Sequence, residues 1–211
     1  MKILFQGDSV TDACRDRNDP HDLGGGYPRY AAAMLQDTFP DIDFEFVNLG
    51  TSFSRTEHLV ERLEPDVIDV QPDIVSIMIG INDVGHHYAS NIETTDEAFE
   101  ANLRQILDAV KTRTHARILL VQPFLLVESD PAKAVFCEEL ARKQAIFKRL
   151  ADEYADAYLA LDEVLHTEAT EEPVYYTEDG VHPTANGACF IAEYYLRAVT
   201  PLVEAVAAEG K

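Results

Sequence analysis

The stretch KILFQGDS, residues 2–9, decides the fold of this chain. Its apolar, partly β-branched run at 3–5 is typical of a buried strand, which stops at the GDS that follows. Thr11 and Asp12 are suitable N-caps for a helix behind that strand. A strand that ends here places the Ser9 hydroxyl at the carboxyl edge of a sheet, where open α/β sheets bind ligands. Gly, Asp and Ser are also common turn formers, so the stretch alone leaves a plain turn open.

Strand-like and helix-like patterns alternate along the rest of the chain. We predict strands over residues 3–5, 43–48, 73–79, 117–121 and 157–161. We predict helices behind the first strand and over residues 27–38, 56–70, 95–112, 131–154 and 184–207. Strands that alternate with helices of this length indicate parallel βαβ units. The sequence therefore predicts an α/β fold, a three-layer α/β/α sandwich with a five-stranded parallel sheet, as a single domain over residues 1–211.

The composition excludes several classes of protein. The chain has 211 residues, of which 46% are hydrophobic, enough for one sizeable core. Its 38 acidic and 17 basic residues give a net charge of −21, which repels nucleic acid and anionic lipid. No apolar run approaches the roughly 18 residues that span a bilayer, and the N-terminus lacks the longer apolar region of a secretory signal. We expect a cytoplasmic protein with no nucleic-acid or membrane partner, and the composition leaves a homo-oligomer open.

Neither the cysteines nor the histidines form a recognisable metal motif. Cys14, Cys137 and Cys189 are an odd number without CxxC spacing, which argues against a disulfide framework and a zinc cluster. We expect them to be small buried or half-buried hydrophobic residues. His86 and His87 are adjacent and cannot share a helix face, so we expect solvent-exposed loop residues. The sequence predicts no metal and no cofactor.

Polar residues stand where several of the predicted elements end. The first strand ends in GDS, the second in NLG at Gly50 and the third in GIND at Asn82, and parallel strands bring these ends to one rim. Near the C-terminus, the proline of DGVHP holds His182 in an extended loop, where Asp179 can accept a hydrogen bond from its ring. A hydroxyl, an imidazole, a carboxylate and several amide donors are what acyl transfer requires. Singly, Asn82 also suits a turn, and Asp179 with His182 a surface ion pair.

These blocks give the chain a family resemblance. GDS at 7–9, VNLGTS at 47–52, GIND at 80–83 and DGVHP at 179–183 occur in this order over nearly the whole length. In this the sequence resembles the GDSL-type, or SGNH, hydrolases. The resemblance implies a flavodoxin-like SGNH hydrolase fold and a carboxylic ester hydrolase. The α/β-hydrolases share the order Ser, Asp, His but need a GxSxG elbow, and the chain has neither this motif nor the phosphate-binding GxGxxG spacing.

The resemblance also implies a role for each matching residue. Ser9 would be the nucleophile, His182 the base and Asp179 its partner. The Ser9 N–H, the Gly50 N–H and the Asn82 side-chain amide would form the oxyanion hole.

One residue departs from the family pattern. The second block often reads Gly-x-Ser-Gly, and Phe53 stands where the second glycine would be. A bulky residue there changes the pocket wall and, if it points into the acyl pocket, leaves room for little more than a methyl group. Six side chains near the same rim are expected to bind substrate, although each also has an ordinary packing role: Asp8, Tyr27, Phe53, Tyr88, Phe124 and Tyr175.

The substrate is predicted from two further likenesses. The run from GDSVTD to LGGGY over residues 7–27, and PF at 123–124, resemble small intracellular deacetylases that act on acetylated sugars, including acetyl-xylan fragments. The chain has no long apolar lid of a lipase, and its anionic surface suits an uncharged sugar. We therefore expect a serine esterase that deacetylates acetylated sugars or xylo-oligosaccharides through an acyl-enzyme.

Three alternatives remain open from the sequence. The first is an acyl hydrolase of the lysophospholipase or thioesterase type. The second is a metal-dependent phosphoesterase that uses Asp8, Asp12, Asp83 and His182 on one ion. The third is a catalytically idle sugar-binding protein with the same fold.

Overall fold

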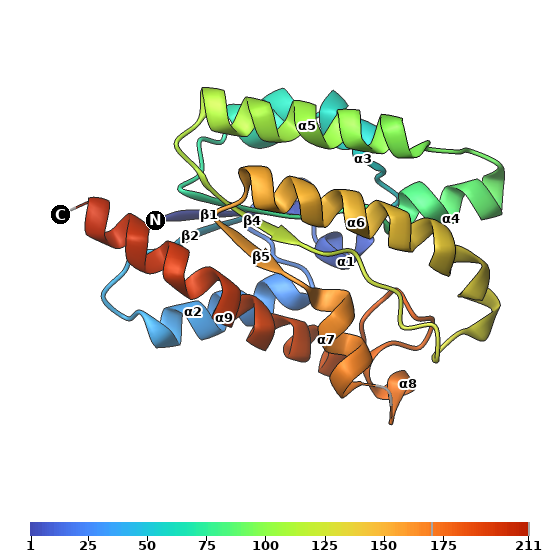
Figure 1. The fold of residues 1–211 in the computed structure, drawn as a ribbon. Helices are drawn as coiled ribbons and strands as arrows, with labels where there is room; N and C mark the ends of the chain where they lie inside the picture. Colours follow the sequence, from blue (N-terminus) through green and yellow to red (C-terminus); the bar gives the residue numbers. More distant parts are fainter. Residues whose placement is uncertain (170, 211) are drawn as a thin grey trace.

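One parallel sheet forms the middle layer of the protein (Figure 1), and its computed structural model describes residues 1–169 and 171–210. The five strands are β1 Lys2–Gly7, β2 Glu45–Asn48, β3 Ile74–Met78, β4 Arg117–Val121 and β5 Ala157–Leu159. Their spatial order is β2-β1-β3-β4-β5, and every neighbouring pair is parallel. The predicted five-stranded parallel sheet is thereby confirmed.

Helices cover both faces of this sheet. The α-helices are α1 Ser9–Asp12, α2 Tyr27–Thr38, α3 Thr56–Glu61, α4 Ile81–Ser90, α5 Asp96–Arg113, α6 Cys137–Tyr154, α7 Leu161–Glu168, α8 Pro173–Tyr176 and α9 Ala185–Glu209. Helices α2 and α9 lie on one face, and α3, α5 and α6 lie on the other (Figure 1). This is the predicted three-layer arrangement. None of the helices in the described residues is both long and apolar enough to cross a membrane.

The first strand shows why an unbroken apolar run belongs in the middle of the sheet. Ile3 and Phe5 face the hydrophobic cluster under α2 and α9, whereas Leu4 faces the cluster under α3, α5 and α6. Successive side chains of a strand point to opposite faces, so a strand covered on both sides must be apolar throughout. On the α2 side, the Phe5 ring packs against Tyr27 and Tyr195, with ring centroids 5.9 and 5.4 Å apart.

Two predicted long helices are interrupted in the structure. The helix expected over 56–70 ends after Glu61, and a separate π-helical turn, η1, covers Glu64–Ile68. Pro65 lies in this turn, and a proline cannot donate the backbone hydrogen bond that would continue an α-helix. The helix expected over 131–154 begins as a 3₁₀ helix, η2, at Pro131–Phe136 before α6 starts.

Four short helices were missed or misplaced. Helix α1 begins at Ser9 because the Asp8 carboxylate caps it, accepting from the Val10 N–H at 3.0 Å. Helix α4 follows β3 directly after Gly80, whose φ of 131° is open to glycine but strained for other residues. Helices α7 and α8 were also not predicted. Because of α4, His86 and His87 lie on a helix and not in a loop, which corrects the prediction.

Candidate active site

The turn from β1 into α1 positions Ser9. Asp8 is buried and uses its carboxylate to cap the helix, so the next residue, Ser9, begins it. Gly7 leaves no space for a side chain, because a Cβ there would lie 2.4 Å from the Met78 carbonyl oxygen and the Thr11 hydroxyl. Because the GDS residues are small, β1 can end close to Met78 and α1 can begin within three residues.

The DGVHP loop brings an imidazole and a carboxylate to Ser9. The Ser9 Oγ lies 2.9 Å from His182 Nε2, and His182 Nδ1 lies 2.8 Å from Asp179 Oδ2. The other carboxylate oxygen, Oδ1, accepts from the backbone N–H groups of His182 at 2.7 Å and Val181 at 3.0 Å. A carboxylate can only accept, so Nδ1 carries the proton and Nε2 is left to accept from the serine hydroxyl. This is the arrangement in which an imidazole activates a serine.

The same contacts shift the ionisation of both groups. The hydrogen bond to Asp179 raises the pKa of His182 above its ordinary value, against the effect of burial. Burial would raise the pKa of Asp179, but the hydrogen bonds from His182 and Val181 outweigh it and hold that pKa well below its usual range. Asp179 therefore stays ionised at all working pH values and stabilises the protonated ring.

The buried Asp8 carboxyl behaves differently. Burial raises the pKa of Asp8 to about 7, although the Val10 N–H and His182 act in the opposite direction. In this structure its carboxylate forms the helix cap described above, and Asp8 is only 1% exposed. The structure therefore places Asp8 beneath Ser9, in a supporting position, and not among the groups open to a substrate.

Gly50, the expected oxyanion donor of the second block, has its N–H already engaged. That N–H donates to Asn48 Oδ1 at 3.0 Å, and the Gly50 carbonyl accepts from Arg15 Nε at 3.0 Å. A Cβ on Gly50 would lie 2.6 Å from the backbone nitrogen of Asp12. Glycine is required at this position by close packing of the loop on α1, and the structure does not support the donor role assigned to it.

Phe53 lies in the same loop and has a left-handed backbone conformation. Its φ is 67°, the left-handed conformation that glycine adopts without strain. Among the described residues its N–H has no hydrogen-bond partner, and its side chain is 73% exposed. The loop therefore keeps a glycine-type backbone although the glycine is absent. Backbone strain of this kind is frequent at functional sites, and the sequence alone does not show it.

Asn82 is the second residue of α4. Its Nδ2 donates to the Ser54 carbonyl at 3.0 Å, which orients the side chain. A carboxamide nitrogen carries two hydrogens, so one N–H remains for a ligand. Asn82 borders both hollows described below and shares the α1 hollow with Ser9 and Phe53.

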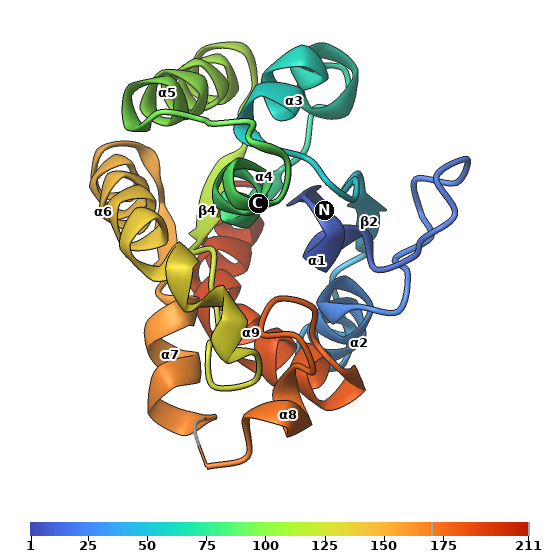
Figure 2. The same cartoon turned by 90° about the vertical axis from the view of Figure 1, so that its right-hand side faces the viewer.

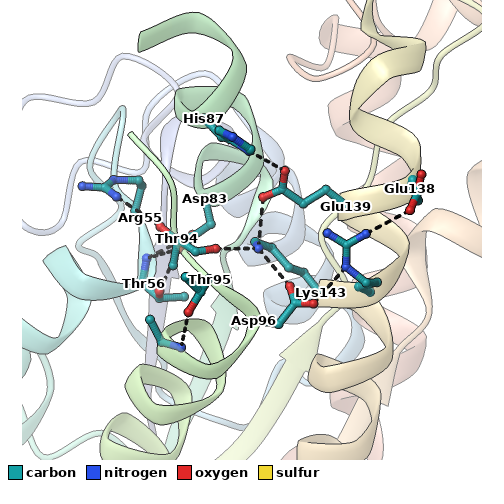
Figure 3. A network of polar contacts seen from close by, with 12 residues as sticks. Arg55, Thr56, Asp83, His87, Thr94, Thr95, Asp96, Glu138, Glu139 and Lys143 are labelled. Carbon is teal, nitrogen blue, oxygen red and sulfur yellow. Dashed lines mark hydrogen bonds and ion pairs between the residues drawn. The ribbon is translucent and has the colours of Figure 1, made fainter. Parts of the chain in front are cut away.

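A network of buried polar groups holds α4 in place (Figure 3). At its start, the buried Asp83 carboxylate accepts from the Thr56 hydroxyl at 2.7 Å. Near its end, His87 Nδ1 lies 2.8 Å from Glu139 Oε2, and the other Glu139 oxygen lies 3.1 Å from the Lys143 ammonium. Both ends of the helix that carries Asn82 are thus tied to neighbouring elements. Burial raises the pKa of Asp83 to about 6, and its bonds to Thr56 oppose this shift.

Two hollows meet at His182, and one of them is also bordered by Ser9. Helices α1 and α4, which contribute residues to them, lie on the side of the molecule that Figure 2 views. The α1 hollow has a volume of about 480 Å³ and is lined by Ser9, Val10, Ala13, Cys14, Gly25, Gly26, Ser52, Phe53, Asn82, His182 and Pro183. The α4 hollow has a volume of about 340 Å³ and is lined by Phe53, Ile81, Asn82, Gly85, His86, Ala89, Ser90, Lys133, Phe136, Asp179, Val181 and His182. Phe53, Asn82 and His182 belong to both, so the exposed Phe53 ring stands at their boundary.

The other expected substrate side chains are placed elsewhere. Tyr27 and Phe124 are buried, 1% and 3% exposed, and the structure places them in neither of these linings. Tyr27 instead packs in the core and pairs its hydroxyl with Thr11 at 3.3 Å. Tyr88 and Tyr175 are exposed but also lie outside both linings. Aromatic residues near the predicted rim could be assigned to core or pocket only from long-range packing.

Two of the three cysteines also differ from expectation, because they are exposed and not buried or half-buried. Cys14 and Cys137 are exposed and Cys189 is intermediate, and all three are free thiols. Cys14 has a φ of 61° and borders the α1 hollow. The sequence analysis therefore missed Cys14 among other residues of this hollow, and His86, Lys133 and Phe136 among those of the other.

The carboxylates required by the phosphoesterase alternative do not converge. Asp12 is paired with Ser52 and Arg17, Asp83 with Thr56, and Asp8 caps α1. Within residues 1–169 and 171–210, no group of three or more histidine, cysteine or acidic side chains is placed to hold a metal ion. The geometry favours a serine-based reaction over one on a shared ion.

Comparison with known proteins agrees with this geometry. The model of the GDSL-like lipase/acylhydrolase family matches residues 5–188. This chain belongs to that family. Membership makes it a carboxylic ester hydrolase, and it confirms the resemblance found in the four sequence blocks.

Individual members of the family are similar over almost the whole chain. An acetylxylan esterase from Geobacillus stearothermophilus is 34% identical over 212 residues, covering 94% of this chain and 93% of that protein. Its crystal structure superposes with a TM-score of 0.81, covering 93% of this chain and 92% of that chain. A protein from Parabacteroides merdae described as a GDSL-like lipase gives a TM-score of 0.90 at 29% identity, covering 95% of each chain. Two further structures of the Geobacillus esterase are of catalytic mutants, one with a serine and one with a histidine replaced by alanine.

Proposed function

We propose that this chain is a serine esterase that removes acetyl groups from acetylated sugars or xylo-oligosaccharides through an acyl-enzyme. The observation that carries the proposal is the hydrogen-bonded series from Ser9 through His182 to Asp179, with distances of 2.9 and 2.8 Å. The catalytic mutants of the Geobacillus acetylxylan esterase, which replace a serine and a histidine, support the same pair of residue types here.

In this mechanism the Ser9 Oγ attacks the ester carbonyl carbon while His182 Nε2 takes the hydroxyl proton. Asp179 holds the ring through Nδ1 and stabilises the imidazolium that forms. The same proton then passes from Nε2 to the leaving sugar oxygen as the ester C–O bond breaks. Water, deprotonated by His182, next attacks the acyl-enzyme and releases acetate and free Ser9.

We assign the oxyanion hole to the Ser9 N–H, the Phe53 N–H and the free hydrogen of Asn82 Nδ2. All three residues border the α1 hollow, and the N–H of Phe53 is available whereas that of Gly50 donates to Asn48. Donors fixed before the reaction stabilise the developing negative charge without further rearrangement. Phe53 thus replaces Gly50 as the donor of the second block.

The choice of an acetyl ester rests on two observations. The Phe53 ring stands at the boundary of the two hollows, beside the proposed oxyanion hole, where it restricts the space for an acyl chain. The similar Geobacillus protein is named as an acetylxylan esterase. In addition, a chain with a net charge of −21 suits an uncharged sugar better than a phospholipid surface.

The decisive test is Ser9→Ala, assayed with p-nitrophenyl acetate and with acetylated xylo-oligosaccharides. We expect ester hydrolysis to be abolished while circular dichroism and the melting temperature stay close to wild type. A fluorophosphonate probe should label wild type at Ser9 and leave the variant unlabelled.

Near wild-type kcat in Ser9→Ala would remove Ser9 as the nucleophile. EDTA should leave the activity unchanged, and a loss that a divalent ion restores would favour the phosphoesterase. A folded wild-type protein that binds xylo-oligosaccharides but turns over no ester would favour the idle sugar-binding protein.

A further inference from the structure

Asp179 has a second cationic neighbour besides His182. The Lys133 ammonium, from η2, donates to the Asp179 backbone carbonyl and lies 3.6 Å from its Oδ2, the oxygen that accepts from the His182 ring. The Lys133 side chain is 23% exposed and borders the α4 hollow. A lysine 46 residues away in sequence therefore shares the carboxylate that orients the imidazole.

The position of Lys133 is itself set by its own short helix. Asp130 caps η2 by accepting from the Ala132 N–H at 3.2 Å, and its Oδ2 lies 3.2 Å from Lys133 Nζ. A backbone hydrogen bond holds the Asp179 loop close by, because the Leu126 N–H donates to the Gly180 carbonyl at 2.9 Å. The ammonium is thus held between two carboxylates, one of which belongs to the proposed triad.

We propose that Lys133 is a positioning residue for the reaction proposed above: it fixes the Asp179 carboxylate and makes protonation of His182 less favourable than Asp179 alone would. The inference rests on the proposed function for its catalytic meaning. Its electrostatic part concerns the folded protein alone and is measurable without a substrate.

The charged groups that face His182 act in known directions. Asp179, on the same loop, and Asp8, at the end of β1, both stabilise the protonated ring and raise its pKa. Lys133, from η2, acts in the opposite direction. Ser9 contributes a neutral hydroxyl at Nε2. Removing the Lys133 charge should therefore raise the pKa of His182, so that more of the base is protonated near neutral pH.

The test uses three variants, each read in two ways. Lys133→Met removes the positive charge and keeps a side chain of similar length, whereas Lys133→Arg keeps the positive charge. Asp130→Asn removes the negative charge beside Lys133 and keeps an oxygen that can accept the hydrogen bond of the helix cap. One measurement is the NMR titration of the His182 ring in the absence of substrate, assigned by comparison with His182→Gln. The other is the acidic limb of kcat/KM against pH with p-nitrophenyl acetate.

For Lys133→Met we expect the midpoint of the His182 titration and the midpoint of the acidic limb to rise by roughly half a pH unit. This is the effect of one charge that acts at short range through a partly solvated medium. Lys133→Arg should stay near wild type. Asp130→Asn should shift both midpoints slightly downward, because Lys133 is then less neutralised. Shifts of opposite sign in Lys133→Met and Asp130→Asn distinguish an electrostatic effect of Lys133 from a general loosening of the loop. If Lys133→Met folds poorly, Asp130→Asn alone provides the test.

An unchanged His182 midpoint in Lys133→Met, with a lower kcat or melting temperature, would make Lys133 a structural residue only. A downward shift in that variant, or an upward shift in Asp130→Asn, would overturn the proposal as well. Failure of the proposed function looks different, because Ser9→Ala would then keep its esterase activity while the substrate-free titration of His182 still reported on Lys133.

Discussion

At the residue scale, the side-chain amide of Asn82 is the donor whose removal is simplest to interpret. Its Nδ2 donates one hydrogen to the Ser54 carbonyl oxygen at 3.0 Å, and the residue borders both hollows. We expect Asn82→Ala to lower kcat by roughly 10²–10³, the usual loss for one oxyanion donor. KM should change little, because the bond strengthens mainly in the transition state. Steady-state kinetics on a variant with a native circular dichroism spectrum checks this, whereas unfolding of the variant would mean that Asn82 has a structural role at the start of α4.

Phe53 combines a backbone and a side-chain effect that two variants separate. Wild type should prefer acetate to butyrate and longer p-nitrophenyl esters, losing roughly 10- to 200-fold in kcat/KM for each methylene that does not fit. Phe53→Ala and Phe53→Gly both remove the ring, so both variants should hydrolyse butyrate and longer esters with a smaller loss of kcat/KM relative to acetate. Only Phe53→Gly also relieves the positive φ, so it should be the more stable of the two.

The ester series and thermal melts of the three proteins provide the measurement. A wild-type optimum at hexanoate or longer would contradict the acetyl preference and favour a lipase or thioesterase. An acetate optimum that persists in both variants would mean that the preference is real and that Phe53 is not its cause.

At the scale of elements, the attachment of α4 to α6 depends on a buried charge. Lys143 is 1% exposed, and its ammonium donates to the Thr94 carbonyl at 2.7 Å and lies 3.1 Å from Glu139 and 3.3 Å from Asp96 (Figure 3). His87 links the same glutamate to α4. Removing one member of a buried ion pair leaves the other charge uncompensated, which is costlier than losing an exposed pair.

We therefore expect Lys143→Met to lower the free energy of unfolding by about 3–5 kcal/mol. Arg142→Met is the matched control, because Arg142 also pairs with Asp96, at 2.9 Å, but is half exposed, and it should cost about 1 kcal/mol or less. Urea denaturation of both variants measures the difference. Equal losses would show that burial of Lys143 contributes nothing, and the double variant Lys143→Met with Glu139→Gln should recover part of the loss.

At the scale of the whole molecule, the charge of −21 acts against the folded state. Like charges repel one another more strongly in the compact protein than in the unfolded chain, and salt screens this repulsion. We expect the melting temperature to rise as NaCl is increased from 10 to 500 mM at about pH 8. The rise should be smaller near pH 5, where part of the carboxylates are closer to neutral. A melting temperature that falls with salt would mean that the ion pairs outweigh the net repulsion.

The sequence determined much of the architecture and the centre of the proposed site. Apolar runs bounded by turn residues located β1, β3 and β4, because a strand buried on both faces must be apolar throughout, and alternation of apolar and polar residues located β2. Ser9 could be placed at a strand end, and Asp179 beside His182, because these positions follow from short turns within one stretch of chain. The proline after His182 and the three-residue spacing to Asp179 act locally, and local geometry is readable without the fold.

Only the tertiary structure decided the contacts between distant segments. The N–H of Gly50 is engaged and that of Phe53 is open because the loop packs on α1, and sequence patterns do not show which amide is used. Tyr27 lies in the core because α9 covers it, although its position in the chain suggested the rim. Lys133 reaches Asp179 across 46 residues through the path of η2. Such contacts depend on how separate elements pack, and the physical chemistry of each segment alone leaves them undetermined.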